Sequence, residues 1–256
     1  MTQSRANHTE VGVEQHSLAQ SIVLHLLPGV LITLFYFATA PVAGELGLPS
    51  VTALFAAIAV ILIPFELGYL LYNGWKRNGS FSLQRTVLFR EHMPWWLYAV
   101  LGLPVFAWMG VVFMIIAAPL NTIFIDRLFT WVPDWFFVFG RTEQLAQYSK
   151  SALAITAVLN LIFNGIAGPV VEELYFRGYL LPRLSRLKGW APLINTLLFS
   201  LYHFFTPWQN LTRILAFGPM VYAVWWKQNI YLGIILHCAG NTVGAIGMLA
   251  LVFASK

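Results

Sequence analysis

The stretch that decides the fold is ALAITAVLNLIFNGIAGPVVEELYFRGYL, residues 152–180. It carries no charged side chain before residue 172, and about 20 mostly apolar residues are enough for a helix to cross a membrane. Glu172, Glu173 and Arg177 then follow at the end of the apolar run. An ionisable side chain in the middle of a bilayer costs about 2.5–3.5 kcal/mol even on a lenient scale. The stretch therefore predicts a transmembrane helix whose charged residues have a specific task.

The composition of the whole chain agrees with a membrane protein. Of its 256 residues, 59% are hydrophobic and 10% are charged, whereas a soluble domain carries about 25% charged residues. The net charge of +5 is spread over several loops, so we interpret it as a topology signal and expect no nucleic-acid partner. The single cysteine excludes a disulfide within the chain.

Apolar runs near the length of a membrane span occur at roughly 21–43, 51–73, 95–118, 151–171, 190–206, 211–226 and 230–253. The fifth and sixth runs are short, and a break at Gly240 or Gly244 would split the last one into two. We therefore expect an all-α, polytopic transmembrane helix bundle of about seven or eight helices. Its expected parts are a disordered polar cytoplasmic tail, N-terminal transmembrane helices with an amphipathic loop, and a C-terminal transmembrane core, at residues 1–20, 21–150 and 151–256.

The positions of Lys and Arg in short loops predict the orientation of the bundle. The loops at 74–93 and 182–189 are basic, and Lys227 stands between the last two apolar runs. We expect the N-terminus and these three basic regions in the cytoplasm. The stretch at 119–150 then faces the other side of the membrane, and its aromatic part, 129–140, is expected to form an amphipathic or re-entrant piece at the headgroup level.

Polar side chains on three of the runs are expected at nearly one depth. At about 1.5 Å per residue from the nearest basic region, Glu172 lies ~16 Å deep, His203 ~21 Å and His237 ~15 Å. Glu173 and Arg177 are four residues apart and are expected to pair on one helix face. Glu172 then needs a partner from another helix.

A carboxylate and two imidazoles at one depth suit hydrolysis of a substrate bond. Glu172 would take a proton from a water molecule, and His203 would hold the same water. His237 and Asn241 would donate hydrogen bonds to the oxygen that becomes negative in a tetrahedral intermediate. The set Glu172, His203 and His237 would also suit a divalent metal such as zinc. The residues alone leave both alternatives open.

Other polar residues at membrane depth have structural interpretations. Asn164 and Asn195 are expected to form hydrogen bonds between helices. Glu66 is expected to be a structural or interfacial carboxylate, because no second polar group matches its position. A lone histidine in a membrane helix is also more often a bridge between helices than a catalyst.

Three motifs, in this order, resemble those of the CAAX-protease and bacteriocin-processing (CPBP) family of intramembrane proteases, in particular its type 2 CAAX prenyl endopeptidases. They are Glu-Glu-x-x-x-Arg at 172–177, Phe-x-x-x-His at 199–203 and His-x-x-x-Asn at 237–241. Each motif lies on its own apolar run. The resemblance covers roughly residues 165–245 and makes 151–256 the expected catalytic core.

The resemblance implies catalytic roles for Glu172, His203, His237 and Asn241 and supporting roles for Glu173, Arg177 and Phe199. Glu172 and His203 would activate the attacking water, and His237 and Asn241 would form the oxyanion site. The family is commonly described as metalloproteases, and a metal-free mechanism that depends on glutamate is the alternative.

The implied activity is that of an intramembrane endopeptidase that cleaves a membrane-anchored or lipidated substrate. The expected partners are membrane lipid and a membrane-anchored peptide or lipoprotein. The expected location is the cytoplasmic membrane of a prokaryote, or the endoplasmic reticulum membrane if the chain is eukaryotic.

Two functions of other classes fit the same polar residues. A non-proteolytic immunity or scaffold membrane protein would use them to hold its helices together and to bind a partner. An ion- or proton-coupled transporter would use the intramembrane carboxylates, but the sequence has no internal repeat. Substitution of Glu172 distinguishes these alternatives from a protease, because only a protease would lose peptide cleavage.

Overall fold

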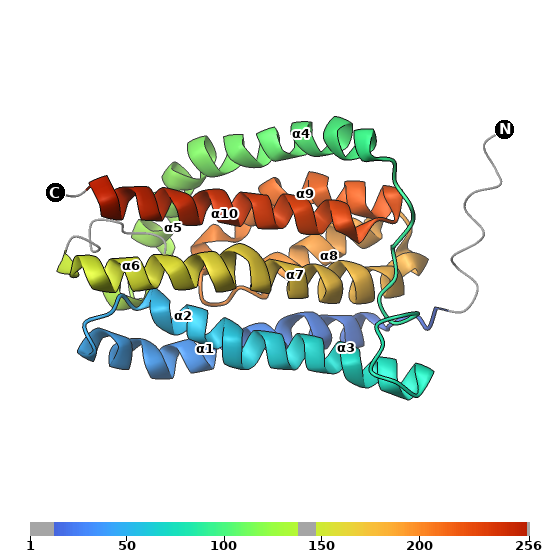
Figure 1. The fold of residues 1–256 in the computed structure, drawn as a ribbon, viewed down its shortest axis with the longest axis horizontal. Coiled ribbons are helices and arrows are strands. Elements are labelled where there is room, and N and C mark those ends of the chain that lie inside the picture. The colour runs from blue at the N-terminus through green and yellow to red at the C-terminus, as the bar shows by residue number, and fades with distance from the viewer. Residues whose placement is uncertain (1–12, 138–146, 255–256) are drawn as a thin grey trace.

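The computed structural model describes residues 13–137 and 147–254, and these fold into seven continuous helical segments. Within these ranges the extended structure is limited to one isolated bridge between Arg90 and Asn229. The segments run roughly parallel or antiparallel to one another along the longest axis of the molecule (Figure 1). The all-α bundle that the sequence predicts is confirmed.

Three of the segments combine α-helix with π-helical or 3-10 turns. The first segment is α1 (Leu18–Glu45). The second contains α2 (Val51–Ala57), η1 (Ile58–Leu62) and α3 (Ile63–Asn78). The third contains α4 (Trp95–Val111), η2 (Val112–Ile116) and α5 (Ala117–Leu128). The fourth contains α6 (Lys150–Leu159), η5 (Asn160–Ala167), α7 (Gly168–Glu172), η6 (Glu173–Leu180) and η7 (Leu181–Leu187). The last three are α8 (Trp190–Leu201), α9 (Asn210–Lys227) and α10 (Ile230–Ala254). The short 3-10 helix η3 (Asp134–Phe136) lies in a loop, and η8 (Pro207–Gln209) leads directly into α9.

Among the described residues, five helical segments are long and apolar enough to cross a membrane. They are Leu18–Glu45, Val51–Asn78, Trp95–Leu128, Lys150–Leu187 and Ile230–Gly247. The two runs that the sequence marks as short fold as α8 and α9, which are outside this group. With 12 residues, α8 is only about 18 Å long, against a hydrocarbon core of about 30 Å. The possible eighth helix is not formed, since α10 continues through Gly240 and Gly244, where a glycine costs only about 1 kcal/mol.

Large apolar side chains cover the outside of the bundle. Met114 is 85% exposed and Trp95 is 82% exposed. A soluble protein rarely presents large continuous apolar patches to water, whereas lipid accepts them without penalty. Together with the five apolar segments, this surface makes the chain an integral membrane protein.

Local side-chain chemistry fixes several helix ends. Ser17 caps α1, because its hydroxyl accepts a hydrogen bond from the backbone N–H of Gln20 at 3.1 Å. Ser149 caps α6 in the same way through the N–H of Ala152. α3 ends at Gly79, whose φ of +67° lies in the left-handed region that glycine adopts at little cost.

The basic regions meet at one end of the bundle, where the N-terminal segment also lies (Figure 1). The loop between α3 and α4 crosses this end, and its Leu88 N–H donates to Gly178 O at 2.7 Å. Phe89 O of the same loop accepts from Ile230 N–H at 2.7 Å. The expected placement of the basic regions on one side of the membrane therefore agrees with the fold.

Residues 13–17 are attached to this end of the bundle. His16 N–H donates to Arg183 O at 3.0 Å, and Gln15 Nε2 donates to Pro182 O at 3.4 Å. The expected disorder of the first 20 residues is therefore wrong from residue 13 onward, because the segment satisfies polar groups of η7. Residues 1–12 lie outside the described part of the chain.

We expect this attachment to weaken as the pH falls from about 6.5 to about 4. Burial, and then the positive charge of Arg183, lower the pKa of His16 from 6.5 to about 4, while Glu14 acts in the opposite direction. Between these two pH values the detached segment binds a proton that the attached one does not, so stability is complete above pH 6.5 and is lost toward pH 4. Hydrogen exchange of residues 13–17, corrected for its intrinsic pH dependence, measures this. His16→Gln should remove the effect, and equal protection of the wild type at pH 7 and pH 4 would contradict it.

The aromatic loop at 129–140 is described up to residue 137, and residues 138–140 lie outside the description. Trp131 is exposed, whereas the buried rings of Phe136 and Phe137 lie 6.2 and 4.9 Å from that of Trp208. Residues 129–137 thus place some aromatic side chains against the bundle and others on its surface, as expected of an amphipathic segment.

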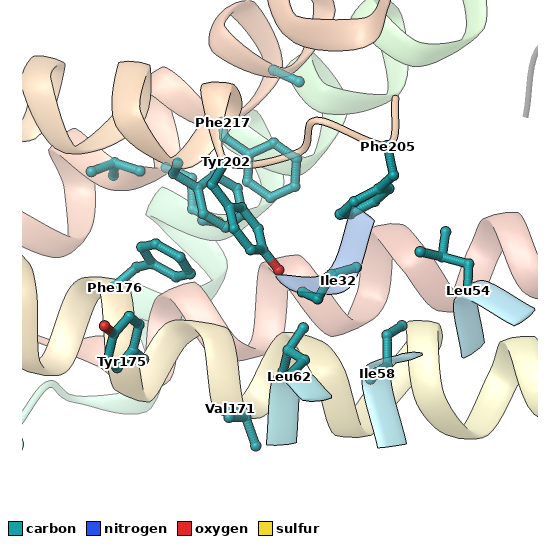
Figure 2. Packing of buried hydrophobic residues seen from close by; sticks show 14 of the residues in the cluster. Ile32, Leu54, Ile58, Leu62, Val171, Tyr175, Phe176, Tyr202, Phe205 and Phe217 are labelled. Carbon is teal, nitrogen blue, oxygen red and sulfur yellow. The ribbon is translucent and has the colours of Figure 1, made fainter. Parts of the chain in front are cut away.

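An aromatic core joins η6 to α1, α8 and α9. Figure 2 shows Phe176 next to Tyr202, with Tyr175 beyond Phe176 and Ile32 on the opposite side of Tyr202. The ring of Phe217 on α9 lies 5.7 Å from that of Phe199 on α8. The Phe176 ring lies 5.0 Å from the ring of Tyr202. This packing holds the helix that carries the two glutamates in the middle of the bundle.

One of the two asparagines forms the expected bridge between helices. Asn195 Nδ2 on α8 donates to Phe176 O at 3.0 Å and lies 3.0 Å from His25 Nε2 on α1. Asn164 Nδ2 instead donates to Asn160 Oδ1 within its own segment, at 2.9 Å.

Candidate active site

The site is built on an irregular helix. α7 is only five residues long and stands between two π-helical stretches, η5 and η6. Pro169 lies in the first turn of α7 and has no N–H to donate, which favours a change of hydrogen-bond register around it. π-helical turns are rare and occur frequently at functional sites. Glu172 and Glu173 stand at the junction of α7 with η6.

Glu173 is the centre of a buried ion-pair group. Its Oε1 lies 3.3 Å from Arg177 Nη1, which is the pair that the sequence predicts. The same oxygen lies 2.9 Å from His237 Nδ1 on α10. The Arg177 guanidinium carbon lies 3.8 Å from the centroid of the Phe199 ring, a geometry that adds a cation–π attraction. α10 approaches this closely because Gly233 has no side chain: a Cβ there would lie 2.6 Å from Glu173 Oε2.

Glu172 is buried and uses its two oxygens differently. Tyr202 donates its hydroxyl hydrogen bond to Glu172 Oε1 at 2.7 Å. Glu172 Oε2 lies 3.8 Å from His237 Nε2. If His237 donates from Nδ1 to Glu173, the lone pair of Nε2 faces Glu172. The structure thus places His237 between the two glutamates of the first motif.

The ring of His203 packs against the aromatic rings of Phe199 and Tyr202. Its Nδ1 lies 2.8 Å from Phe199 O, and its ring lies 4.4 Å from that of Tyr202. Phe199 also contacts the His237 ring, at 6.0 Å between centroids. Within the described residues, His203 makes neither a hydrogen bond nor an ion pair with Glu172. Tyr202, the preceding residue, takes that position.

Asn241 points away from His237. Its Nδ2 donates to Asn164 O at 2.8 Å, and Thr242 Oγ1 next to it donates to Gly165 O at 3.4 Å. Both acceptors are backbone carbonyls of the π-helical stretch η5. The hydrogen-bond pattern of η5 differs from that of an α-helix, and these two carbonyls accept hydrogen bonds from side chains of α10. The expected partnership of His237 and Asn241 as two donors to one oxygen is not formed in this conformation.

The donor set was also expected to suit a metal. In the described part of the chain, no three His, Cys, Asp or Glu side chains converge into a metal-binding group. Glu172 and His237 face each other, but His203 directs its Nδ1 to a backbone carbonyl. The geometry does not fit a three-ligand zinc site made of these residues, so no step below is derived through a metal. The metal content of the active purified protein tests the expected metal site. A stoichiometric metal that is lost in both the Glu172→Ala and the His203→Ala variants would support that site.

Glu66 on α3 belongs to the buried polar group, so of the structural and interfacial roles expected from the sequence, the interfacial one is wrong. It is fully buried and interacts electrostatically with Glu172 and Arg177. Neither of its oxygens has a hydrogen-bond partner among the described residues. This neighbourhood could not be predicted from the sequence, because depth along a helix does not show which helices lie side by side.

Arg213 on α9 was not among the residues expected near the site. It is buried, donates to Thr206 Oγ1, and donates to Gln209 Oε1 and Asn210 Oδ1 at 3.1 Å each. It also interacts electrostatically with Glu172. Arg213 therefore ties the turn after α8 to α9. The cost of a charge in an apolar run would have identified it.

The comparisons with known proteins agree with the three motifs. The family model described as Type II CAAX prenyl endopeptidase Rce1-like matches residues 154–243. This range contains the motifs of Glu172, His203 and His237, whereas α1 to α5 lie outside it. No curated protein and no solved structure matches the chain. Over residues 154–243, this integral membrane protein is therefore similar to the Rce1-like type II CAAX prenyl endopeptidase family.

Proposed function

We propose that this protein is an intramembrane endopeptidase that hydrolyses a peptide bond of a membrane-anchored or lipidated substrate. The observation that carries the proposal is the buried pair of Glu172 Oε2 and His237 Nε2, 3.8 Å apart. Both atoms are hydrogen-bond acceptors when His237 donates to Glu173. Two acceptors at this separation suit one water molecule that donates a hydrogen to each. The Rce1-like family match supports a peptidase.

In the proposed mechanism, Glu172 acts as the general base. Glu172 Oε2 takes a proton while the water oxygen forms a bond to the substrate carbonyl carbon. The tetrahedral intermediate then collapses, the C–N bond breaks, and Glu172 returns the proton to the leaving nitrogen. The products are a carboxylic acid and an amine. Glu173 keeps His237 in the required tautomer through the 2.9 Å contact with Nδ1.

The oxyanion role that the motif implies for His237 and Asn241 requires a rearrangement. Asn241 Nδ2 would exchange Asn164 O for the substrate oxygen, and His237 would carry a proton on Nε2 at that stage. The first change is a side-chain movement and the second is a proton transfer to His237 Nε2 from the attacking water, so neither requires α10 to move.

Glu172 and Glu173 lie in the second half of the helical segment Lys150–Leu187, which ends at the basic regions. We infer that the site opens toward the cytoplasm and that the protein resides in the cytoplasmic membrane of a prokaryote. Its partners would then be lipid and a membrane-anchored peptide or lipoprotein.

We expect Glu172→Gln to lower turnover by about 100-fold or more, because a positioned general base contributes about 10²–10⁴-fold. The purified protein in proteoliposomes, with a membrane-anchored peptide and mass-spectrometric detection of the products, measures this. Glu91→Gln is the matched control, because Glu91 is exposed at the basic end and should leave turnover unchanged. Unchanged turnover by a folded Glu172→Gln protein would contradict the proposal.

The alternative is a non-proteolytic immunity or scaffold protein. It is favoured by the way Glu173 joins η6 to α10 through Arg177 and His237, which would stabilise the bundle without any chemistry. On this hypothesis, cells that carry Glu172→Gln keep the biological phenotype. Loss of the phenotype with the fold preserved would count against it.

A further inference from the structure

One oxygen of Glu172 is held by a side chain outside the three motif positions. Tyr202 is fully buried, and its hydroxyl lies 2.7 Å from Glu172 Oε1. Figure 2 shows this hydroxyl pointing into the middle of the core cluster. Among the described residues, Tyr202 is the one hydrogen-bond donor to Glu172. The other oxygen, Oε2, is left facing His237.

We propose that Tyr202 is a positioning residue that fixes the orientation of the Glu172 carboxylate, with one oxygen bound to Tyr202 and the other facing His237 as the base, an inference that rests on the proposed role of Glu172. The last side-chain torsion of glutamate is broad and roughly two-fold, so the plane of a free carboxylate turns over a wide range of angles. The Tyr202 bond removes this freedom, because it occupies Oε1. Oε2 is then held permanently toward His237.

The Tyr202 side chain is well suited to this task because its position does not depend on the hydrogen bond. Its ring packs 5.0 Å from that of Phe176 and 5.8 Å from that of Phe199. Its backbone is fixed against α1, where a Cβ on Gly29 would lie 1.9 Å from Tyr202 O. A donor fixed by packing keeps a reacting group in place without reorganisation during the reaction.

The acceptor distinguishes Tyr202 from the other buried tyrosines. Tyr36 donates to Trp135 O at 3.2 Å, and Tyr175 donates to Leu24 O at 2.8 Å. Both of these acceptors are neutral backbone carbonyls. A hydrogen bond to a carboxylate is about twice as strong as a neutral one. Tyr202 is therefore placed to act on the reactivity of Glu172 as well as on the packing of the bundle.

The test is the steady-state kinetics of Tyr202→Phe on the membrane-anchored peptide. We expect kcat to fall about 10–100-fold, as for loss of a hydrogen bond to a charged group, with KM within about twofold. Tyr36→Phe is the matched control, since it also removes a buried hydroxyl, but one that donates to Trp135 O and not to Glu172, and its kcat should stay within about twofold. A purely structural role of Tyr202 would not separate kcat from KM in this way.

A second pair of variants keeps the test independent of folding. 4-Aminophenylalanine and 4-methylphenylalanine at position 202 have nearly the same volume, and only the first can donate a hydrogen bond. We expect the amino variant to exceed the methyl variant in kcat by about tenfold. Equal kcat for these two variants, or wild-type kcat for Tyr202→Phe, would overturn the inference about Tyr202. The proposed function would still stand in that case, provided that Glu172→Gln is inactive. If Glu172→Gln is active, the proposed function itself fails.

Discussion

Arg177→Met is expected to lower the free energy of unfolding by about 3–5 kcal/mol, the range for removing one partner of a buried ion pair. Arg177 is fully buried, and none of its three guanidinium nitrogens has a hydrogen-bond partner among the described residues. Its stabilising interactions are therefore those of charge: Glu173 at 3.3 Å, the Phe199 ring at 3.8 Å, and electrostatic attraction to Glu172 and Glu66. Methionine fills a similar volume but leaves the buried carboxylates without this cation.

Thermal unfolding in detergent measures this effect of Arg177→Met. Arg186→Met is the matched control, because Arg186 is exposed on η7, where a substitution changes stability by no more than about 0.5 kcal/mol. The two variants remove the same charge a few residues apart in one helical segment. Equal midpoints for both variants would show that Arg177 is not needed to hold the glutamates in the bundle.

Gly29→Ala is expected to destabilise the protein by about 1–3 kcal/mol, the range for overpacking, and to reduce turnover. The new Cβ would lie 1.9 Å from Tyr202 O and 2.7 Å from Tyr202 C. Both are backbone atoms, so a side-chain rotation cannot relieve the contact, and α1 and the turn after α8 must separate. The separation withdraws the Tyr202 hydroxyl from Glu172.

Gly44→Ala provides the control for Gly29→Ala within the same helix. A Cβ at Gly44 would meet nothing within 4 Å, and alanine is favoured over glycine in a helix by about 0.5–1 kcal/mol. Gly44→Ala should therefore keep the wild-type melting temperature and turnover, or raise the former slightly. A Gly29→Ala protein with unchanged melting temperature and turnover would contradict the close approach of α1 to Tyr202.

Hydropathy and spacing were sufficient for those features that depend on one helix at a time. The seven apolar runs correspond to seven helical segments, because the bilayer requires each backbone to satisfy its own hydrogen bonds. The pair of Glu173 and Arg177 follows from their separation along one helix. The depth estimate brought Glu172 and His237 to one level, and the structure places them 3.8 Å apart.

Features that depend on how helices rotate and lie beside one another could not be predicted in this way. Depth does not distinguish His203 from Tyr202, which are neighbours in the chain but face different partners. Asn241 was expected to face the same oxygen as His237, but the π-helical register of η5 offers it a carbonyl. Glu66 lies on a segment without any motif, and only the packing of α3 on the site helix shows its place.

The contact of Gly29 with Tyr202 bears on how far the family domain is an independent unit. The matched range begins at residue 154, whereas Gly29 lies on α1 and Glu66 lies on α3. Both residues contribute to the surroundings of Glu172 and its hydroxyl partner. A chimera that grafts residues 154–243 onto other transmembrane helices would therefore keep every motif and still lack one wall of the site. The range that the family model matches is therefore smaller than the set of helices that surrounds the site.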